Sequence, residues 1–264
     1  MHPRQTMDQK MPLVNVITVA YNARDDLEKT IRSVVGQTYP SINYIVIDGG
    51  SEDGTVEMIE KYEDKIGYFI SEKDKGIYDA MNKGMSHVSK GYINFLNAGD
   101  EYISKNTIDD IFKGIGDSYD LIYGKIIVGP IASDASNKPQ DTWDFTVDNL
   151  LAQNTAVLCH QAMFISKDAA PLYDASYKIK GDLDWYFKIL YKKPQLTYCK
   201  SDVIVTSYKG GGLSEKKYLL DVYETARVII KRFGFSSFIK HKYHRLIGER
   251  IFKEIGLSSL MQKK

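Results

Sequence analysis

The sequence predicts an α/β protein built on a mostly parallel sheet. Within about the first hundred residues, short apolar segments rich in β-branched residues alternate four times with amphipathic helical segments. This alternation is typical of parallel strands joined by right-handed crossovers. A polar or acidic residue follows each apolar segment, and parallel strands end at one edge of a sheet, where ligands bind. We therefore expect Asn22, Asp48, Asp74 and Asp100 to converge at that edge.

The first half of the chain carries the four units of this pattern. Strands are expected over residues 13–20, 44–47, 68–70 and 92–96. Apolar residues at helical spacing occupy the intervals between them. The last strand runs into the turn Asn97–Asp100, which places a carboxylate at the end of a buried strand. Neither a Gly-x-Gly-x-x-Gly motif nor a Walker A motif is present, so another device must hold any phosphates.

The second half of the chain departs from this rhythm. Further strands are expected over residues 121–128, 156–165 and 196–208, with polar loops over 129–142 and 209–214. A helix is expected to begin at Gly181, and His160 is interpreted as a buried supporting residue. Two more helices are expected over residues 217–233 and 237–255.

Composition indicates an ordinary soluble globular protein of 264 residues, 43% hydrophobic and 26% charged. No membrane-spanning run or signal peptide is apparent, so a cytoplasmic location is expected. Two cysteines are too few for a disulfide framework. We divide the chain into a disordered stretch 1–10, a single α/β domain over residues 11–214 and basic amphipathic helices over residues 215–264.

The charge is distributed unevenly between these parts. Residues 215–264 contain 12 Lys or Arg and 5 Asp or Glu, a net charge of +7, so the rest of the chain carries −6. A basic amphipathic segment favours peripheral contact with the inner face of an anionic membrane, or with a second copy of the chain. A solvated helical face is the alternative interpretation. No nucleic-acid partner is expected.

Several short motifs, taken in order, resemble the family-2 inverting nucleotide-sugar glycosyltransferases, which have the GT-A fold. The resemblance spans roughly residues 13–214. Its pieces are TVAYN at 18–22, QTYP at 37–40, IDGGSEDGT at 47–55, DKGIYDAMNKG at 74–84, FLNAGD at 95–100, CHQ at 159–161 and GDLD at 181–184. Any single piece is a weak signal, whereas all of them in this order form a specific one.

The resemblance implies roles for individual residues. Asp48 would read the nucleotide base, Asp100 would hold a divalent cation, Mn²⁺ or Mg²⁺, and Asp182 would be the catalytic base, with Asp184 as runner-up. The remaining residues implied to bind the nucleotide sugar are Thr18, Ala20, Tyr21, Asn22, Asp74, Gly76, Asp79, Asn82, Lys83 and Asn97.

Two positions depart from the family pattern. The DxD motif is reduced to Asn97–Asp100, so one carboxylate, diphosphate oxygens and water would have to hold the cation. Met81 stands where many family members carry Arg, and Lys83 is the nearest substitute cation. These departures make the need for a metal an open question.

The implied function is transfer of a hexosyl group, with inversion, from a UDP- or GDP-sugar to a glycan or lipid-linked acceptor in cell-surface polysaccharide synthesis. A nucleotidyltransferase is one alternative, but it should carry a glycine-rich phosphate loop near its first strand. A non-catalytic nucleotide- or carbohydrate-binding module is the other, and it would need neither Asp100 nor Asp182. The donor sugar, the acceptor and the linkage are not specified by the sequence.

Overall fold

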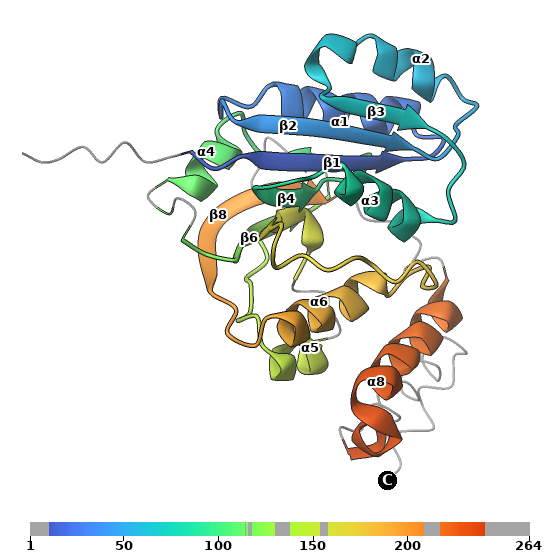
Figure 1. The fold of residues 1–264 in the computed structure, drawn as a ribbon, viewed down its shortest axis with the longest axis vertical. Coiled ribbons are helices and arrows are strands. Elements are labelled where there is room, and N and C mark those ends of the chain that lie inside the picture. Colours follow the sequence, from blue (N-terminus) through green and yellow to red (C-terminus); the bar gives the residue numbers. More distant parts are fainter. Residues whose placement is uncertain are drawn as a thin grey trace, which may run out of the picture.

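The computed structural model describes residues 11–113, 115, 118–129, 138–153, 158–208 and 217–240. Its centre is an eight-stranded sheet in the order β3-β2-β1-β4-β7-β6-β8-β5 (Figure 1). The strands are β1 Val14–Ala20, β2 Ile42–Asp48, β3 Tyr68–Ser71, β4 Tyr92–Phe95, β5 Glu101–Tyr102, β6 Leu121–Val128, β7 Met163–Ser166 and β8 Tyr198–Tyr208.

The first four strands are all parallel, as the sequence predicts. Beyond β4 the sheet becomes mixed. β7 runs antiparallel to both β4 and β6, and β5 runs antiparallel to β8, while β6 and β8 are parallel. The chain is therefore an α/β protein with a mostly parallel sheet and some antiparallel pairs.

Helices cover both faces of this sheet (Figure 1). One apolar cluster joins the sheet to α1, α2 and α4, and the other joins it to α3, α5, α6 and α8. The helices are α1 Arg24–Val35, α2 Thr55–Glu60, α3 Ile77–Ser86, α4 Thr107–Phe112, α5 Val147–Gln153, α6 Gly181–Lys192 and α8 Tyr218–Lys240. Two short 3₁₀ turns, η1 Glu63–Lys65 and η2 His160–Ala162, complete the described elements.

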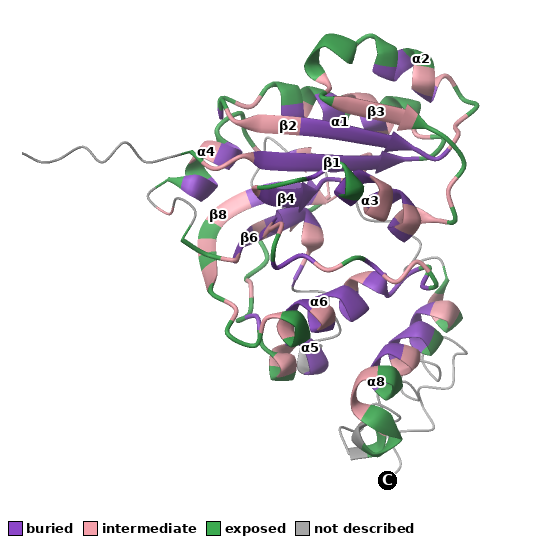
Figure 2. Cartoon of the chain, in the orientation of Figure 1, coloured by how far each residue is buried: buried purple, intermediate pink, exposed green. Residues whose placement is uncertain are grey.

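Strand β1 lies in the middle of the parallel half and is buried along its whole length (Figure 2). Its side chains alternate between the two apolar clusters: Val16 packs on the α1 side and Ile17 on the α3 side. A strand covered on both faces needs apolar residues at nearly every position, which explains why the sequence pattern predicted it well.

The expected strand over residues 156–165 is wrong in its first part. Residues 154–157 lie outside the described ranges, His160–Ala162 forms η2, and the strand is confined to Met163–Ser166. Asn94 of β4 explains the change, because its side-chain amide donates to the carbonyls of Gln161 and Met163 at 3.0 and 2.8 Å. These side-chain bonds hold the turn against β4 where a regular ladder would otherwise run.

Helix α8 joins nearly all of the expected helix 217–233 and the first residues of the expected helix 237–255 into one element. Its backbone breaks at Gly234, where φ is 79°, a conformation that glycine adopts readily. Val228 and Ile229 are buried against the cluster that contains α6, whereas Leu219, Tyr223 and Phe235 are exposed. The remainder of the expected helix 237–255 beyond Lys240 lies outside the described residues, as does the expected loop 209–214.

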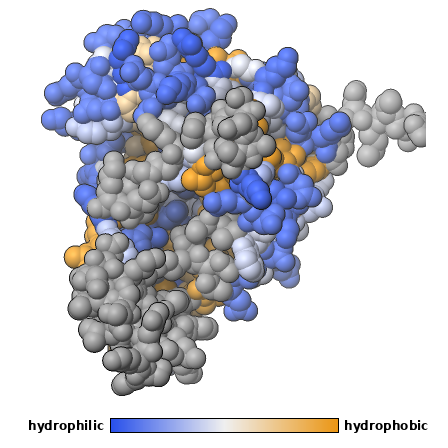
Figure 3. Space-filling model, turned by 180° about the vertical axis from the view of Figure 1, so that it is seen from behind, coloured by the Kyte–Doolittle hydropathy of each residue, from blue (hydrophilic) through white to orange (hydrophobic). Residues whose placement is uncertain are grey.

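The surface of the described residues is mostly hydrophilic when the molecule is seen from behind, with a hydrophobic patch near the middle of that view (Figure 3). Each helix within the described ranges is too short or too polar to span a membrane. Cys159 and Cys199 are partly buried free thiols.

Candidate active site

The turn after β2 is organised by the carboxylate of Asp48. This side chain is fully buried, and it accepts the backbone N–H groups of Gly50 and Ser51 at 3.0 and 2.9 Å. The hydroxyls of Ser51 and Ser71 donate to it at 2.5 and 2.6 Å. A carboxylate has about four lone-pair positions, so these four donors use the full hydrogen-bonding capacity of Asp48. They fix the turn after β2 to the end of β3. A base contact by Asp48 stays a prediction and requires one of these bonds to be exchanged.

Asp74 approaches the same turn from the loop after β3. A Cβ atom on Gly49 would lie 2.6 Å from Asp74 Oδ2 and 3.3 Å from the ring of Tyr21, so glycine is needed for this close approach. The other oxygen of Asp74 accepts the N–H of Gly76 at 2.7 Å. Tyr21 is 65% exposed. The side chains of Tyr21 and Asp74 therefore flank Gly49 at the carboxyl edge of the sheet.

Asn22 joins the loop after β1 to the loop after β2. Its N–H donates to the hydroxyl of Ser51 at 2.7 Å, and its side-chain oxygen accepts the N–H of Glu52 at 3.0 Å. Its φ of 48° is one that asparagine tolerates better than most residues. The loops that carry Asn22, Asp48 and Asp74, three of the four residues predicted to converge, thus lie together.

Thr18 and Ala20 lie beneath this edge rather than on its surface. Thr18 is fully buried, and its hydroxyl accepts the Tyr44 hydroxyl at 3.1 Å. Ala20 is 7% exposed. Contact of either residue with a nucleotide stays a prediction.

Helix α3 begins beside the Asp74 loop. Gly76 has a φ of 125°, and Asp79 closes the first turn by accepting the N–H of Lys75 at 3.0 Å. Lys178, from the segment before α6, donates to the carbonyl of Lys75 at 2.5 Å. A Cβ on Gly76 would lie 3.2 Å from Lys178 Nζ. The fold therefore brings to this loop a lysine that no sequence motif had indicated.

The other α3 residues of the predicted site have internal partners. Asn82 donates to the carbonyl of Tyr173 at 3.0 Å and accepts its N–H at 2.8 Å, so both ends of its amide hold the loop before α6. Lys83 pairs with Glu72 at 2.8 Å. Met81 is fully buried in the core, so it has no part in the surface of the site. Ligand contacts by Asn82 and Lys83 stay predictions.

The turn that carries Asp100 is tied to α1 and η2. The hydroxyl of Thr30 accepts the N–H of Gly99 at 2.9 Å and bonds to the carbonyl of Asp100 at 2.8 Å. The side-chain amide of Gln161 donates to Asp100 Oδ2 at 3.0 Å. Asp100 is only 4% exposed. Its carboxylate is therefore held in a defined position beneath the surface of the carboxyl edge.

Asn97 and His160 form a neighbouring pair. Asn97 Nδ2 lies 3.1 Å from His160 Nε2, and burial lowers the pKa of His160 to about 4. A neutral imidazole can accept at Nε2, so we assign the donor role to Asn97 and the ring proton to Nδ1. The oxygen Oδ1 of Asn97 is buried and has no hydrogen-bond partner among the residues that the structure describes. This orphaned oxygen is the feature of the turn that best fits an additional ligand.

The donor set suits a hard divalent cation only in part. Asn97 Oδ1 and the Asp100 carboxylate supply the oxygen atoms that Mg²⁺ and Mn²⁺ prefer. No group of three or more His, Cys, Asp or Glu side chains among the described residues is arranged to hold a metal. The turn therefore fits a cation that takes its remaining ligands from a bound diphosphate and water.

The two acids at the start of α6 have different surroundings. Asp184 is fully buried and is paired with Arg232 at 2.6 Å and with Lys188 at 3.3 Å. Asp182 is partly exposed and accepts the N–H of Leu183 at 2.8 Å. It pairs with no cation among the described residues, and burial raises its pKa. The surroundings of Asp182 are therefore compatible with the predicted role of catalytic base, which stays a prediction.

A family model described as "Glycosyl transferase family 2" matches residues 15–171. The chain belongs to glycosyl transferase family 2. The curated relatives of this family-2 chain include an uncharacterized glycosyltransferase of Mycobacterium tuberculosis, 47% identical over 79 residues. That match covers 30% of either chain, so the family-2 chain spans under a third of the length of this relative. A "PGL/p-HBAD biosynthesis glycosyltransferase" of Mycobacterium bovis is 26% identical over 83% of this chain and 88% of its own.

Solved structures share the fold of the family-2 chain at low sequence identity. TarS of S. aureus, in complex with UDP-GlcNAc, aligns with a TM-score of 0.61 and 15% identity over 91% of this chain and 73% of that chain. A mannosyltransferase of Pyrobaculum calidifontis, in complex with GDP-Man and Mn²⁺, aligns with a TM-score of 0.60 and 14% identity over 84% and 64%. These matches support the GT-A type architecture predicted from the sequence.

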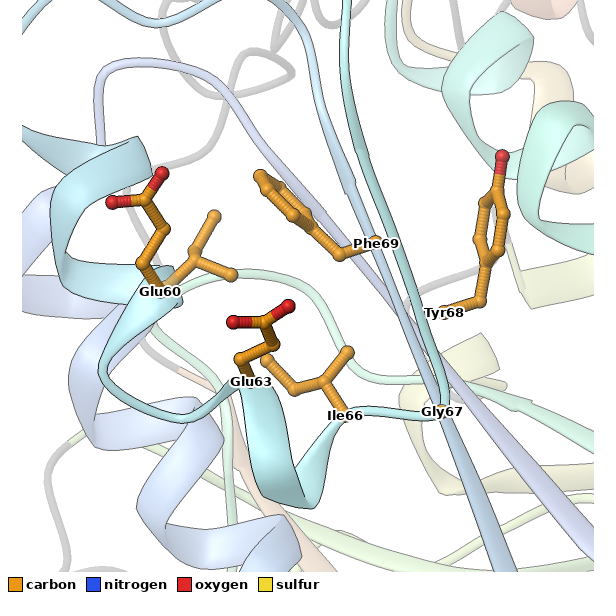
Figure 4. Close-up of a pocket in the computed structure, with 7 residues that line it drawn as sticks. Glu60, Glu63, Ile66, Gly67, Tyr68 and Phe69 are labelled. Atoms are coloured by element: carbon orange, nitrogen blue, oxygen red, sulfur yellow. The ribbon is translucent and has the colours of Figure 1, made fainter.

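A pocket of about 530 Å³ in the family-2 chain lies away from this edge (Figure 4). It is lined by Ile66 and Phe69, with the carboxylates of Glu60 and Glu63 beside them. The pocket is at the amino end of β3, whereas Asp74 follows the carboxyl end of that strand. It therefore has no part in the candidate active site.

Sequence reasoning missed several residues that shape the site of the family-2 chain. Lys178 and Glu224 belong to no motif. The side chain of Lys178 binds the carbonyl of Lys75, and the carboxylate of Glu224 in α8 accepts the backbone N–H of Lys178, so both contacts join segments far apart in the chain. Gly49 was visible in the sequence as part of a Gly-Gly pair. A glycine directly after a strand-end acid indicates that another group lies close to the backbone there. In this protein that group is the carboxylate of Asp74.

Proposed function

We propose that the protein is an inverting glycosyltransferase that moves a hexosyl group from a UDP- or GDP-sugar to a hydroxyl of a glycan or lipid-linked acceptor. The observation that carries the proposal is the separation of the two acids of α6. Asp184 is held in a buried ion pair, whereas Asp182 is partly exposed, has a raised pKa and forms no ion pair within the described part of the chain. A carboxyl with a raised pKa is a stronger base than an ordinary aspartate, as general-base catalysis requires.

In the proposed reaction, Asp182 takes the proton of the acceptor hydroxyl as its oxygen bonds to the anomeric carbon of the donor. The bond from that carbon to the diphosphate oxygen breaks, and its electron pair leaves with the nucleoside diphosphate. Attack from the face opposite the leaving group inverts the anomeric configuration, so no covalent intermediate on the protein is needed.

The leaving diphosphate develops negative charge that must be neutralised. A divalent cation at Asn97 and Asp100 would supply that neutralisation without a proton. Lys178 is the cation that the fold brings to the loop before α3, and we assign it the same electrostatic task. The mannosyltransferase solved with GDP-Man and Mn²⁺ has this fold and supports the assignment of a metal.

The donor is assigned to the edge formed by the loops after β1, β2 and β3. Tyr21 and Asp74 flank Gly49 there, and Asn22, Asp48, Thr18 and Ala20 support these loops. We place the sugar and diphosphate between this edge and the start of α6. The relative named for PGL/p-HBAD biosynthesis supports a role in making a cell-surface glycan or glycolipid.

We further propose that residues 215–264 bring the enzyme to an anionic surface at the inner face of the membrane. Their net charge of +7 and the exposed Leu219, Tyr223 and Phe235 of α8 support this proposal. Association with a second copy through the same residues is the alternative.

The function is tested with a panel of nucleotides and nucleotide sugars. UDP, GDP, UDP-GlcNAc and GDP-Man are each added with and without Mn²⁺, and the melting temperature is recorded, because a ligand that binds only the folded state stabilises it. We expect stabilisation by one nucleotide series, followed by release of the free nucleoside diphosphate when an acceptor is supplied. Pyrophosphate release from a nucleoside triphosphate would instead identify a nucleotidyltransferase, and binding without turnover would identify a binding module.

A further inference from the structure

The segment that leads into α6 is fastened on one side to α3. The hydroxyl of Tyr78 donates to the carbonyl of Ile179 at 2.6 Å. The ring of Tyr78 lies so close to Gly181 that a Cβ on this glycine would be 2.5 Å from it. Asn82 binds the backbone of Tyr173 in both directions, as described above. The chain just before Asp182 therefore has a fixed distance from α3.

The same segment is fastened on its other side by a single carboxylate of α8. Glu224 is 2% exposed and accepts three consecutive backbone N–H groups. Its Oε1 binds the N–H of Lys178 at 2.8 Å, and its Oε2 binds those of Ile179 and Lys180 at 2.8 and 2.9 Å. Bonds from backbone N–H groups to a charged, buried acceptor are stronger than neutral ones. Glu224 thus fixes the backbone conformation of these three residues.

A second contact from the preceding turn of α8 reaches the same place. Lys180 Nζ lies 2.8 Å from Asp221 Oδ1, and the two side chains are only 11% and 9% exposed. Asp221 and Glu224 are three residues apart, so they lie on one face of α8. That face of the helix is therefore complementary to the segment 178–180.

We propose that Glu224 is a positioning residue for catalysis, holding Lys178 over the loop before α3 and Asp182 toward the acceptor. The proposal rests on the function proposed above, and it extends the catalytic unit to α8, which lies outside residues 15–171 that match the family model. Lys178 is the first of the three residues whose N–H groups bind Glu224, and Asp182 follows the last of them by two residues, so a shift of this backbone moves both side chains. A misplacement of about 1 Å at a reacting group can cost about 100-fold in rate.

Other contacts of α8 dock the helix on residues 174–177 and do not touch residues 178–180. Lys231 pairs with Asp174 at 2.7 Å, and Arg227 binds Ser176 at 2.7 Å and lies over the ring of Tyr177. These contacts provide a matched control, because their loss weakens docking of α8 but leaves the Glu224 carboxylate in place.

The test compares Glu224→Gln with Lys231→Gln in the full chain. The glutamine keeps one acceptor oxygen and turns an amide donor toward the N–H groups, so we expect faster hydrogen exchange at Lys178, Ile179 and Lys180. We expect kcat for transfer from UDP-GlcNAc or GDP-Man, whichever the wild type uses, to fall about 10- to 100-fold. The donor KM should stay within about twofold, and Lys231→Gln should change neither exchange there nor kcat.

Glu224→Asp is the conservative variant, since it restores a charged acceptor on a shorter side chain. We expect it to recover part of the lost kcat and of the lost exchange protection together. Loss of kcat with unchanged exchange at residues 178–180, or full activity despite lost protection, overturns the proposal. If the wild type has no transferase activity but its hydrogen-exchange protection at residues 178–180 depends on Glu224, the proposed function is wrong although Glu224 does hold this backbone.

Discussion

Asp184 and Arg232, 48 residues apart in the sequence, form a two-point contact in which the Nε and Nη2 groups of the arginine both donate to Oδ1 of the aspartate, at 2.8 and 2.6 Å. Asp184 is fully buried, and the Arg232 side chain is 18% exposed. The pair joins the first turn of α6 to α8. It supports the proposal that the base is the first acid of the Gly181–Asp184 motif and not the second.

The first prediction is that Asp184→Asn mainly lowers stability. Removing one partner of a buried ion pair leaves the other charge uncompensated and costs about 3–5 kcal/mol. For a chain of this size, we expect the melting temperature to fall by roughly 6–12 °C. Calorimetry measures this fall, and activity below the new melting temperature should be largely retained.

Lys231→Gln is the control for this prediction. It breaks the more exposed pair with Asp174, which joins the same helix to the body, and it should change stability by less than about 1 kcal/mol. A stable but inactive Asp184→Asn variant would transfer the role of the base from Asp182 to Asp184.

The parallel half of the fold follows from local sequence, because each strand there is short, apolar and followed by a polar turn. β1 is buried on both faces, so every residue of Val14–Ala20 contributes to the pattern. The region of Gln161 and Met163 was not predictable in this way. Its conformation depends on hydrogen bonds from Asn94, 67 and 69 residues earlier in the chain, and no local pattern reports such bonds.

The site was predicted to a similar degree. The pattern of a polar residue after each parallel strand placed Asn22, Asp48, Asp74 and Asp100 at one edge, and the structure brings the loops of the first three together. The sequence could not show that Asp48 is occupied by four internal donors, because three of them come from a turn whose shape depends on the carboxylate itself. The sequence also could not show the role of Glu224 in holding residues 178–180, because its partners are backbone N–H groups, which no side-chain motif reports.

The second prediction separates Asp48 from Asp74 in nucleotide binding. Asp74→Ala should weaken binding of the preferred nucleotide with little change in melting temperature, because the carboxylate flanks Gly49 at the edge. Asp48→Ala should weaken binding and also lower stability, because four donors lose their acceptor and an unsatisfied buried group costs about 1–3 kcal/mol. Titration calorimetry gives the affinities. Unchanged affinity in both variants would remove this edge from the nucleotide site.

The third prediction concerns the cation. Asp100→Asn should abolish stimulation of transfer by Mn²⁺, while the bond from Gln161 can be kept by an amide oxygen, so the fold should persist. Circular dichroism checks the fold, and rates at several Mn²⁺ concentrations check the stimulation. Full wild-type activity in excess EDTA would show that Lys178 and the protein dipoles suffice for the leaving group.

The fourth prediction is that the C-terminal segment binds anionic lipid. The enzyme should co-sediment with vesicles that contain phosphatidylserine, less with neutral vesicles and less at high salt, because each Lys or Arg near the surface contributes about 1 kcal/mol. Replacing exposed Leu219 and Tyr223 by Ser should weaken the association. A concentration-dependent dimer in light scattering, indifferent to lipid, would assign the segment to self-association.

The fifth prediction is that Asp182 is the catalytic base. Removing a general base typically lowers the rate by about 10²–10⁴, so Asp182→Asn should reduce kcat by that factor. Affinity for the donor should change little, because the base contacts the acceptor on the opposite face of the reacting carbon. Donor affinity is measured by calorimetry and kcat by release of the nucleoside diphosphate.

The pH dependence of both activity and stability gives an independent check on Asp182. Burial raises its pKa above the ordinary value of 3.8, so kcat should fall on acidification at a pH higher than an ordinary aspartate would give, because the base must be ionised. A folded-state pKa above the unfolded one means that this carboxyl favours folding below its unfolded pKa, and that the contribution is lost as pH rises through the folded pKa. At neutral pH its charge therefore opposes folding. Asp182→Asn, which carries no charge, should melt no lower than the wild type there even though it is inactive. An inactive variant that melts well below the wild type would instead indicate a structural role for this carboxylate.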